Sequence, residues 1–189
     1  IPEKIVSGTT QVTKSPDRLF LADLTARFCE EAGIIRDGFS FQAGSGGTAL
    51  SIGIYFAEML KAKGMKSRFA RGGSNAYLVK MLEDGLVDYI LHGQTFHLEG
   101  VRSMRQNPTH VDTSPFTSYN YHSKGNFAQL MDVVILGATE VDVHFNANVV
   151  THSDGVLLHG IGGWQNCLFA KCTILPIPLF RDRIPVIRG

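Results

Sequence analysis

The chain has 189 residues, 44% of them hydrophobic and 19% charged, which suits one globular domain with a substantial core. Lys and Arg (18) nearly balance Asp and Glu (17), so a formal net charge of +1 argues against a nucleic-acid-binding surface and against an acidic disordered tail. No apolar run reaches the roughly 18 residues of a membrane span, so we expect no membrane contact.

Residues 1–16 contain two prolines and show little periodicity, and we expect them to connect an upstream region to a domain over 17–189. The chain starts with Ile1 and stops directly after an apolar run, which indicates a fragment whose domain is truncated at its end. A helix is predicted over 15–33, because Ser15 is a suitable N-cap and a proline follows it. Apolar residues recur in it at helical spacing: Leu19, Phe20, Leu24 and Phe28.

Beyond this helix, short apolar runs alternate with helical patterns that end at glycines. The predicted strands cover 39–43, 66–73, 87–93, 132–142, 145–150 and 173–180, and the predicted helices cover 48–64, 75–85, 98–107 and 162–172. Residues 108–127 are the least regular stretch. Several strands are apolar on both faces, which predicts an α/β fold with three α/β/α layers around a largely parallel, partly mixed sheet.

Three glycine clusters fall at strand-to-helix junctions: 44–47, 72–73 and 162–163. Ligands of parallel sheets bind beyond the carboxyl ends of the strands, so we expect all three clusters at the same edge. Each cluster alone is explained by ordinary turn chemistry. The run Gly44-Ser45-Gly46-Gly47, however, has more glycine than a turn requires, and exposed amides at a helix N-terminus can bind a carboxylate, a phosphate or a developing oxyanion.

Two better-known motifs fit this run poorly. Gly44, Gly46 and Ala49 give the G-x-G-x-x-A spacing of a dinucleotide site, but the acid expected about 20 residues later is missing, and Arg68 and Arg71 lie there instead. Ser45 directly follows a glycine, so the G-x-S-x-G elbow of serine hydrolases is absent.

Metal binding and disulfide bonding have no sequence support. No CxxC pair is present, and the histidines form no i, i+4 pair within a clear helix. The seven histidines are His92, His97, His110, His122, His144, His152 and His159, and the three cysteines are Cys29, Cys167 and Cys172. We therefore expect no metal, free thiols and, because no signal segment opens the chain, a cytoplasmic location.

Two further stretches carry a family resemblance. TEVDVHFNANV (139–149) and SDGVLLHGIGGWQNC (153–167) resemble the C-terminal half of the acyl-CoA:carboxylate CoA-transferases. Together with FQAGSGGTALS, FARGGSNAYLVKMLEDGLV, FNANVVTHSDGV and RIPV, they resemble the citrate lyase alpha subunit from about Leu19 to the end of the chain. The resemblance implies a CoA-transferase fold, related to that of sugar-phosphate isomerases, and it covers only part of the family's subunit.

The family implies citrate CoA-transferase activity. An acetyl thioester, on CoA or on the CoA-like arm of an acyl-carrier subunit, exchanges with citrate to give a citryl thioester and acetate, and a lyase subunit then cleaves the citryl group. The implied partners are the acyl-carrier and lyase subunits and further copies of the chain. Specificity for citrate over other di- and tricarboxylates is not fixed by the sequence.

The resemblance also implies roles for particular residues. The run 44–47 would supply oxyanion or substrate amides, and Gly160, Gly162 and Gly163 would bind the acyl or pantetheine portion. Because citrate is a tri-anion, Arg68 or Arg71 is a candidate counter-charge, although either can equally be an ordinary surface residue. The expected substrate-binding residues are Arg68, Arg71, Gly72, Gly73, Asn146 and Asn148.

One departure bears on the mechanism. Many relatives use a glutamate that becomes a CoA thioester, but the corresponding stretch here, ARGGSNAY, has none, and Glu140 is not assigned that role. This favours direct transfer in a ternary complex through a mixed anhydride. Two alternatives stay open: a sugar-phosphate isomerase-like enzyme, and a binding or assembly domain whose catalysis lies in another region, so that the isolated fragment is inactive.

Overall fold

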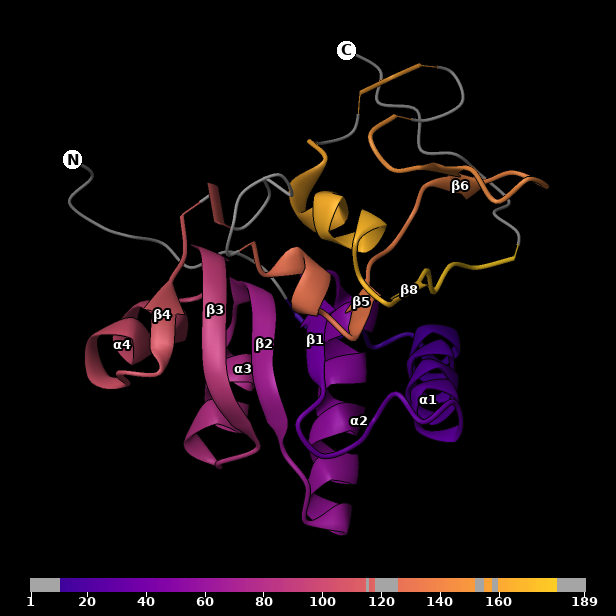
Figure 1. Cartoon of the computed structure of the whole chain (residues 1–189). Helices are drawn as coiled ribbons and strands as arrows, with labels where there is room; N and C mark the ends of the chain where they lie inside the picture. Colours follow the sequence, from indigo (N-terminus) through magenta and orange to yellow (C-terminus); the bar gives the residue numbers. More distant parts are fainter. Residues whose placement is uncertain (1–10, 115, 118–125, 152–154, 158–159, 180–189) are drawn as a thin grey trace.

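The computed structural model describes residues 11–114, 116–117, 126–151, 155–157 and 160–179. Six parallel strands form one sheet in the order β4-β3-β2-β1-β5-β8 (Figure 1). Their bounds are β1 Ser40–Ala43, β2 Ser67–Ser74, β3 Val87–Thr95, β4 His110–Asp112, β5 Val133–Ile135 and β8 Cys172–Ile174. The α/β class and the parallel sheet are confirmed. The antiparallel part lies outside this sheet, in a hairpin of β6 (Glu140–Val141) and β7 (Ala147–Asn148).

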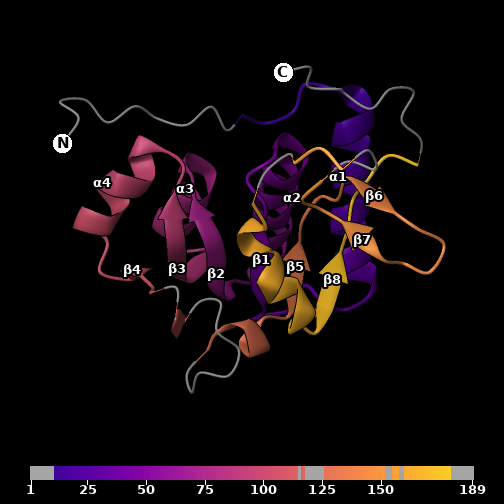
Figure 2. The ribbon, with the colours of Figure 1, turned by 90° about the horizontal axis from the view of Figure 1, so that it is seen from above.

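Helices cover one face of the sheet, and short 3₁₀ helices lie on the other (Figure 2). The first layer holds α1 Pro16–Glu31, α2 Gly47–Lys63, α3 Ala76–Glu83 and α4 Leu98–Gln106; the second holds η1 Ala128–Leu130 and η2 Gly162–Leu168. The α-helix expected over 162–172 is thus a shorter 3₁₀ helix. The strand expected over 132–142 also divides, because the chain leaves the sheet after Ile135 and pairs again only in the β6–β7 hairpin.

Two hydrophobic clusters hold the layers together. On the helical side, Phe39, Phe41 and Phe56 pack with ring centroids 5.5–5.8 Å apart, joining β1 to α2. On the opposite side, Phe69 and Met131 lie in a smaller cluster with Val134 and Cys167, beneath η2. Neighbouring residues of β2 therefore serve opposite faces, because Ala70 belongs to the first cluster and Phe69 to the second, as a pleated strand requires.

Helix α1 does not turn its large apolar residues inward. It buries Ala22, Thr25, Ala26 and Cys29, whose small side chains allow close approach to α2, while Phe20, Leu24 and Phe28 are 63%, 44% and 55% exposed. The helix was predicted correctly from its periodicity, but the face that the large residues define is not the one that packs against the domain.

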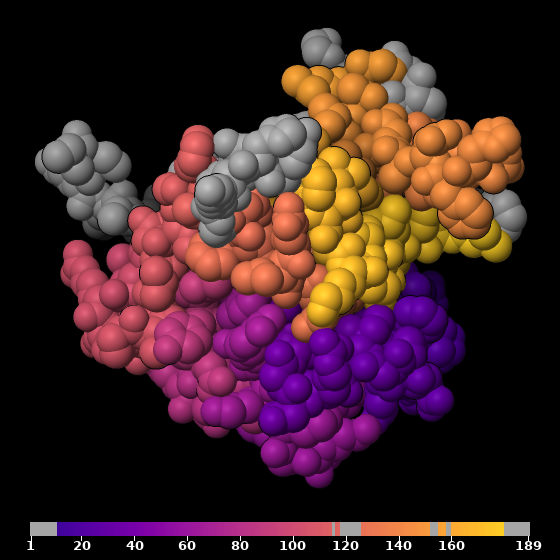
Figure 3. Space-filling view, viewed as in Figure 1, coloured from indigo at the N-terminus to yellow at the C-terminus, as the bar shows by residue number. Residues whose placement is uncertain are grey.

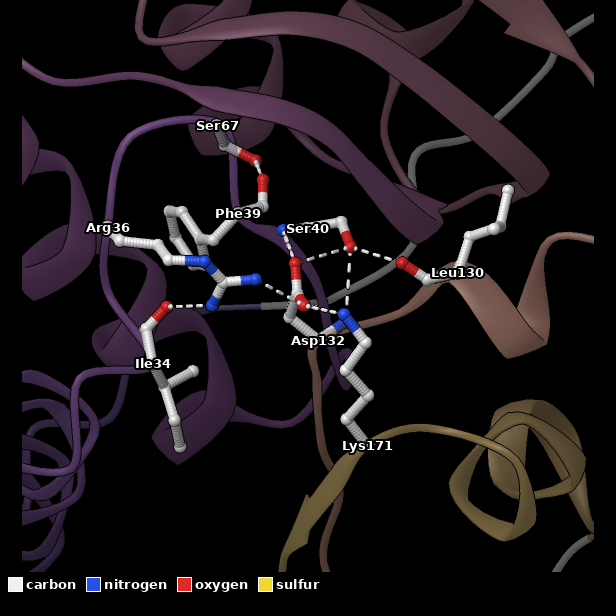
Figure 4. Close-up of polar contacts among 8 residues, drawn as sticks. All are labelled: Ile34, Arg36, Phe39, Ser40, Ser67, Leu130, Asp132 and Lys171. Carbon is white, nitrogen blue, oxygen red and sulfur yellow. Dashed lines mark hydrogen bonds and ion pairs between the residues drawn. The ribbon is translucent and has the colours of Figure 1, made fainter.

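Asp132 joins three strands at the amino end of the sheet (Figure 4). Its carboxylate accepts hydrogen bonds from the Ser40 amide at 2.9 Å, from Arg36 at 2.7 Å and from Lys171 at 2.8 Å. Burial alone would raise the pKa of Asp132, but these donors outweigh it and lower the pKa to about 2. The contact fixes β5 and β8 against β1, and so aligns their carboxyl ends at the opposite edge.

The expected connector and the expected truncated end lie largely outside the described residues, because these exclude 1–10 and 180–189. The division of the chain into 1–16 and 17–189 therefore stays a prediction. Within the described part, none of the helices is both long enough and apolar enough to cross a membrane.

Candidate functional site

A cavity of about 850 Å³ lies at the carboxyl ends of β1, β2 and β5. All three glycine clusters line it, as the junction argument predicted: 44–47, 72–73 and 162–163, with Gly160 beside the last. In Figure 3 the orange atoms, around residues 140–150, stand above the rest of the molecule, whereas β5 and β8 belong to the sheet itself. The strand order reverses at β1, because β2 to β4 extend to one side and β5 and β8 to the other, and such a point is where open parallel sheets bind ligands.

The surroundings in which a side chain would have to fit differ among the three glycines of the first loop. A Cβ on Gly44 would lie 2.9 Å from the Leu136 side chain, and one on Gly47 would lie 2.9 Å from the Gln11 carbonyl oxygen. A Cβ on Gly46, the N-cap of α2, would meet no described atom within 4 Å. Packing therefore explains Gly44 and Gly47, whereas the N-cap Gly46 adds no side chain between the cavity and the start of α2, and no side chain caps this helix.

The second cluster forms an irregular end to β2. The pairing with β3 shifts register between Gly72 and Gly73, and Gly72 has a φ of 111°, which a residue with a side chain rarely adopts. A Cβ on Gly73 would overlap the ring of Phe96, which follows β3. Gly73 therefore shapes the cavity wall by letting Phe96 approach the strand.

Gln42 on β1 holds the third cluster in place. Its Nε2 donates to the Gly163 carbonyl at 3.1 Å, and its Oε1 accepts from the Asn166 amide at 2.6 Å. The Trp164 indole also donates to the Gly137 carbonyl at 3.1 Å. Sequence reasoning missed Gln42 as a site residue. The available signal was an amide side chain within an apolar strand, two residues before the glycine run.

The two arginines proposed as counter-charges do not line this cavity. Arg68 is exposed near the start of β2 with its guanidinium 5.4 Å from the Phe69 ring centroid. Arg71 is buried and lines a separate small cavity with Tyr77 between β2, α2 and α3. A third arginine, Arg18 on α1, lines the main cavity.

Asn146 and Asn148 lie in the β6–β7 hairpin and do not line the cavity either; their neighbour Val149 does. The Asn146 side chain donates to Asp142 at 2.8 Å, and the Asn148 side chain donates to Glu140 at 3.2 Å. Both amides therefore stabilise the hairpin, and their expected contact with substrate stays a prediction.

The cavity has few groups that can act as nucleophile or base. Among its described lining residues there is no Asp, Glu, His or Cys. Cys167 lies in η2, where burial raises the pKa of its thiol to about 12, so it is not a thiolate at neutral pH. Within the described ranges, no three His, Cys, Asp or Glu side chains form a metal site. The polar groups of the described lining include backbone amides, hydroxyls, the side-chain amides of Gln42 and Gln94, and the side chain of Arg18.

A protein-family model for "Citrate lyase, alpha subunit (CitF)" matches residues 1–188. The chain belongs to the citrate lyase alpha subunit family. It is 38% identical over 187 residues to the citrate lyase alpha chain of Haemophilus influenzae and 36% identical to that of Klebsiella pneumoniae, covering 98% of this chain and 37% of each relative. The chain thus spans little more than a third of these curated relatives.

A solved structure agrees with this assignment. The alpha subunit of citrate lyase from Streptococcus mutans, in complex with citrate, superposes with a TM-score of 0.91 at 36% identity, over 98% of this chain and 37% of that one. A malonate decarboxylase hetero-tetramer from Pseudomonas gives a TM-score of 0.55 at 24% identity over 80% of this chain. At that identity, the second similarity supports the fold alone.

Proposed function

We propose that this chain forms part of a citrate CoA-transferase, in which an acetyl thioester and citrate exchange to give a citryl thioester and acetate. Family membership supports this proposal, as does the Streptococcus mutans relative described in complex with citrate. One observation carries it further: Gly46 leaves the α2 N-terminus uncovered beside a cavity with no acidic lining residue in the described part. Such amides favour carboxylates and the oxyanion of a thioester under attack.

The proposed reaction has two steps. A citrate carboxylate oxygen attacks the acetyl carbonyl, the C–S bond breaks, and a citryl-acetyl anhydride and a thiolate form. The thiolate then attacks the citryl carbonyl, and acetate leaves. CoA, or the CoA-like arm of an acyl-carrier subunit, supplies the thiol as co-substrate. This route forms no acyl-enzyme intermediate, in agreement with a described cavity lining that has no glutamate.

Specific residues take roles in this proposal. The loop 44–47 would stabilise the oxyanion, Gly72 and Gly73 would leave room for citrate, and the segment 160–163 that Gln42 positions would contact the acyl or pantetheine portion. We propose that the acyl-carrier and lyase subunits are its partners, that the chain self-associates, and that it works in the cytoplasm.

One observation favours a second function. Because no described lining residue is a general acid or base, the chain can instead be a binding and assembly domain whose catalytic groups come from another region of the subunit. This reading also predicts that the isolated chain is inactive. The isomerase-like alternative has no comparable support.

The deciding experiment uses a full-length subunit that contains this chain, incubated with acetyl-CoA and citrate. Mass spectrometry is expected to detect citryl-CoA, and peptide analysis is expected to find no CoA-glutamyl adduct on this chain. Transfer to other carboxylates but not to citrate would overturn the substrate, and an adduct on this chain would overturn direct transfer. Activity in the full subunit but not in the isolated chain would favour the shared-site reading.

A further inference from the structure

Arg18 is the one charged side chain among the described residues that line the main cavity. It lies in the first turn of α1, and Leu21, one turn later, lines the same cavity, so this face of the helix forms part of the wall. Neither Arg68 nor Arg71 lies there. Arg18 is therefore the candidate cationic partner, within the described chain, for an anion that binds in this cavity.

Three other arginines of the described part are engaged in ion pairs. Arg27 pairs with Asp23 at 2.7 Å, Arg36 with Asp132 at 2.7 Å, and Arg102 with two glutamates. Arg18 is exposed and has no hydrogen bond or ion pair to any residue within the described ranges. A guanidinium that the fold does not use, placed at the wall of a cavity, is available to a ligand.

A backbone contact places the segment before α1 beside the α2 N-terminus. The Thr13 amide donates to the Gly47 carbonyl at 3.3 Å, and the Thr13 hydroxyl accepts from the Ser15 amide at 3.2 Å. Since α1 begins at the next residue, the segment crossing the glycine loop leads directly into the turn that carries Arg18. The uncovered amides beside Gly46 and the guanidinium of Arg18 thus belong to one cavity from two neighbouring elements.

The Arg18 side chain and the α2 N-terminus, which carries a partial positive charge, together suit a ligand with more than one carboxylate. We propose that Arg18 binds a carboxylate of the acceptor substrate, bidentately, while another carboxylate lies at the α2 N-terminus, and that Arg18 thereby selects di- and tricarboxylates over monocarboxylates. The planar guanidinium matches a carboxylate in this geometry better than an ammonium does. This inference rests on the proposed transferase function and assigns its specificity to a residue outside the glycine motifs.

The test measures citrate binding to the full-length subunit by calorimetry. Arg18→Gln is expected to weaken binding roughly 10- to 100-fold, the usual effect of losing a hydrogen-bonded charge pair, and Arg18→Lys is expected to restore part of it. Arg105→Gln is the matched control, because Arg105 is also exposed and unpaired among the described residues but lies on α4, away from the cavity. The melting temperature of both variants is expected to stay unchanged.

A series of acids sharpens the test. The loss caused by Arg18→Gln is expected to be largest for citrate, smaller for glutarate and within twofold for acetate. It is also expected to shrink as salt is raised. Equal binding of citrate by the Arg18→Gln and Arg105→Gln variants would overturn the role of Arg18, as would an equal loss for citrate and acetate.

The outcomes separate this inference from the proposed function. If the unchanged subunit binds citrate but forms no citryl-CoA, the transfer reaction fails while the comparison of variants still decides the role of Arg18. If the unchanged subunit binds none of the acids, both proposals are overturned. If it forms citryl-CoA and the Arg18→Gln variant binds citrate normally, only the role of Arg18 is overturned.

Discussion

Gly46 differs from the glycines beside it, because protein packing does not require it. A Cβ there would contact no described atom, and its backbone φ of −70° is open to any residue. Gly44 and Gly47, by contrast, lie against Leu136 and the 11–13 segment. Glycine is a common N-cap residue, and at this position beside the cavity it also leaves room for a ligand close to the backbone.

Gly46→Ala tests this reading of the loop. The added methyl group would cost less than about 1 kcal/mol of stability, the difference between glycine and alanine at an N-cap. Since the methyl group would occupy the approach to the α2 amides, transfer from acetyl-CoA to citrate is expected to fall at least roughly tenfold. Steady-state kinetics and thermal melting of the full-length subunit would measure the two effects.

The matched control for this variant is Gly53→Ala. Gly53 lies inside α2, also with no described atom within 4 Å of its Cβ, and does not line the main cavity. The substitution is expected to raise stability by up to about 1 kcal/mol and to leave transfer unchanged. Normal transfer by the Gly46→Ala variant would show that its backbone is not approached by substrate.

The same residues show how far the candidate site could be predicted. The glycine clusters were predictable because three of them fall at strand-to-helix junctions, and a parallel sheet brings such junctions to one edge. Arg18 and Gln42 were not, since their positions depend on how the segment 11–13 crosses the glycine loop before α1 begins and on how η2 folds over β1. Both are long-range contacts that leave no local pattern.

Among the elements, β2, β3, β4 and α4 share a buried chain of polar side chains. His92 Nε2 lies 3.2 Å from Asp112, so it carries the proton and Nδ1 accepts from Ser74 at 2.6 Å. The Ser74 oxygen then accepts from His110 Nε2 at 3.1 Å, and His110 Nδ1 accepts from Ser103 at 2.8 Å. With both imidazoles neutral, every link of this chain has one donor and one acceptor.

This chain predicts that the β3–β4 edge is sensitive to acid. Burial, and secondarily the nearby His92, lower the pKa of His110 to about 4 from an ordinary 6.5, and burial lowers that of His92 despite Asp112. Between pH 6.5 and 4, these two imidazoles therefore bind more protons in the unfolded chain than in the folded one. Stability is expected to be full above pH 6.5 and to fall by roughly 3 kcal/mol toward pH 4 on account of His110.

Urea unfolding at several pH values would measure this slope. His110→Gln would be less stable at pH 7.5, because the Ser74 and Ser103 bonds weaken, but its stability would change less between pH 6.5 and 4. His144→Gln is the control, since His144 is exposed at the hairpin tip. A slope in the His110→Gln variant equal to that of the unchanged chain would contradict the assignment.

Element prediction succeeded where the signal was local. Gly64 and Gly85 end α2 and α3 with positive φ, and Asn75 caps α3 by accepting from the Leu78 amide, as glycine and Asn are known to do. Prediction failed for η2, where GGWQNC has helical spacing but is held against β1 through Gln42 in a 3₁₀ turn. Contact across the sheet, not local preference, decides that segment.

At the scale of the whole molecule, the sheet joins two halves of the chain at one seam. β1 pairs with β2 on one side and with β5 on the other, although about 90 residues separate β1 from β5, as Ser40 and Asp132 show. The cavity lies at the carboxyl end of this seam and Asp132 at its amino end. The fold class followed from alternating elements, but the seam did not, because nothing in the sequence states which strands become neighbours.

Asp132→Asn is expected to weaken the contacts that hold β5 and β8 against β1, although Asp132 does not line the cavity. The carboxylate is nearly buried and accepts from Arg36, Lys171 and Ser40, so the neutral amide would cost roughly 2–4 kcal/mol of unfolding free energy. Asp88→Asn is the control, because Asp88 pairs with Lys66 at the surface, where such pairs contribute about 1 kcal/mol or less. Urea unfolding at pH 7 would compare the two variants.

The pH dependence of stability provides a second, independent test of the role of Asp132. Because the pKa of Asp132 is lowered from 3.8 to about 2, its stabilisation is complete above pH 3.8 and is lost as pH falls through about 2. The Asp132→Asn variant should therefore lose less stability over that interval than the unchanged chain, while retaining citrate binding at temperatures where it stays folded. If it instead unfolds no more readily than the Asp88→Asn variant, the two halves are held together by strand pairing and core contacts alone, and the alignment of the cavity walls does not depend on Asp132.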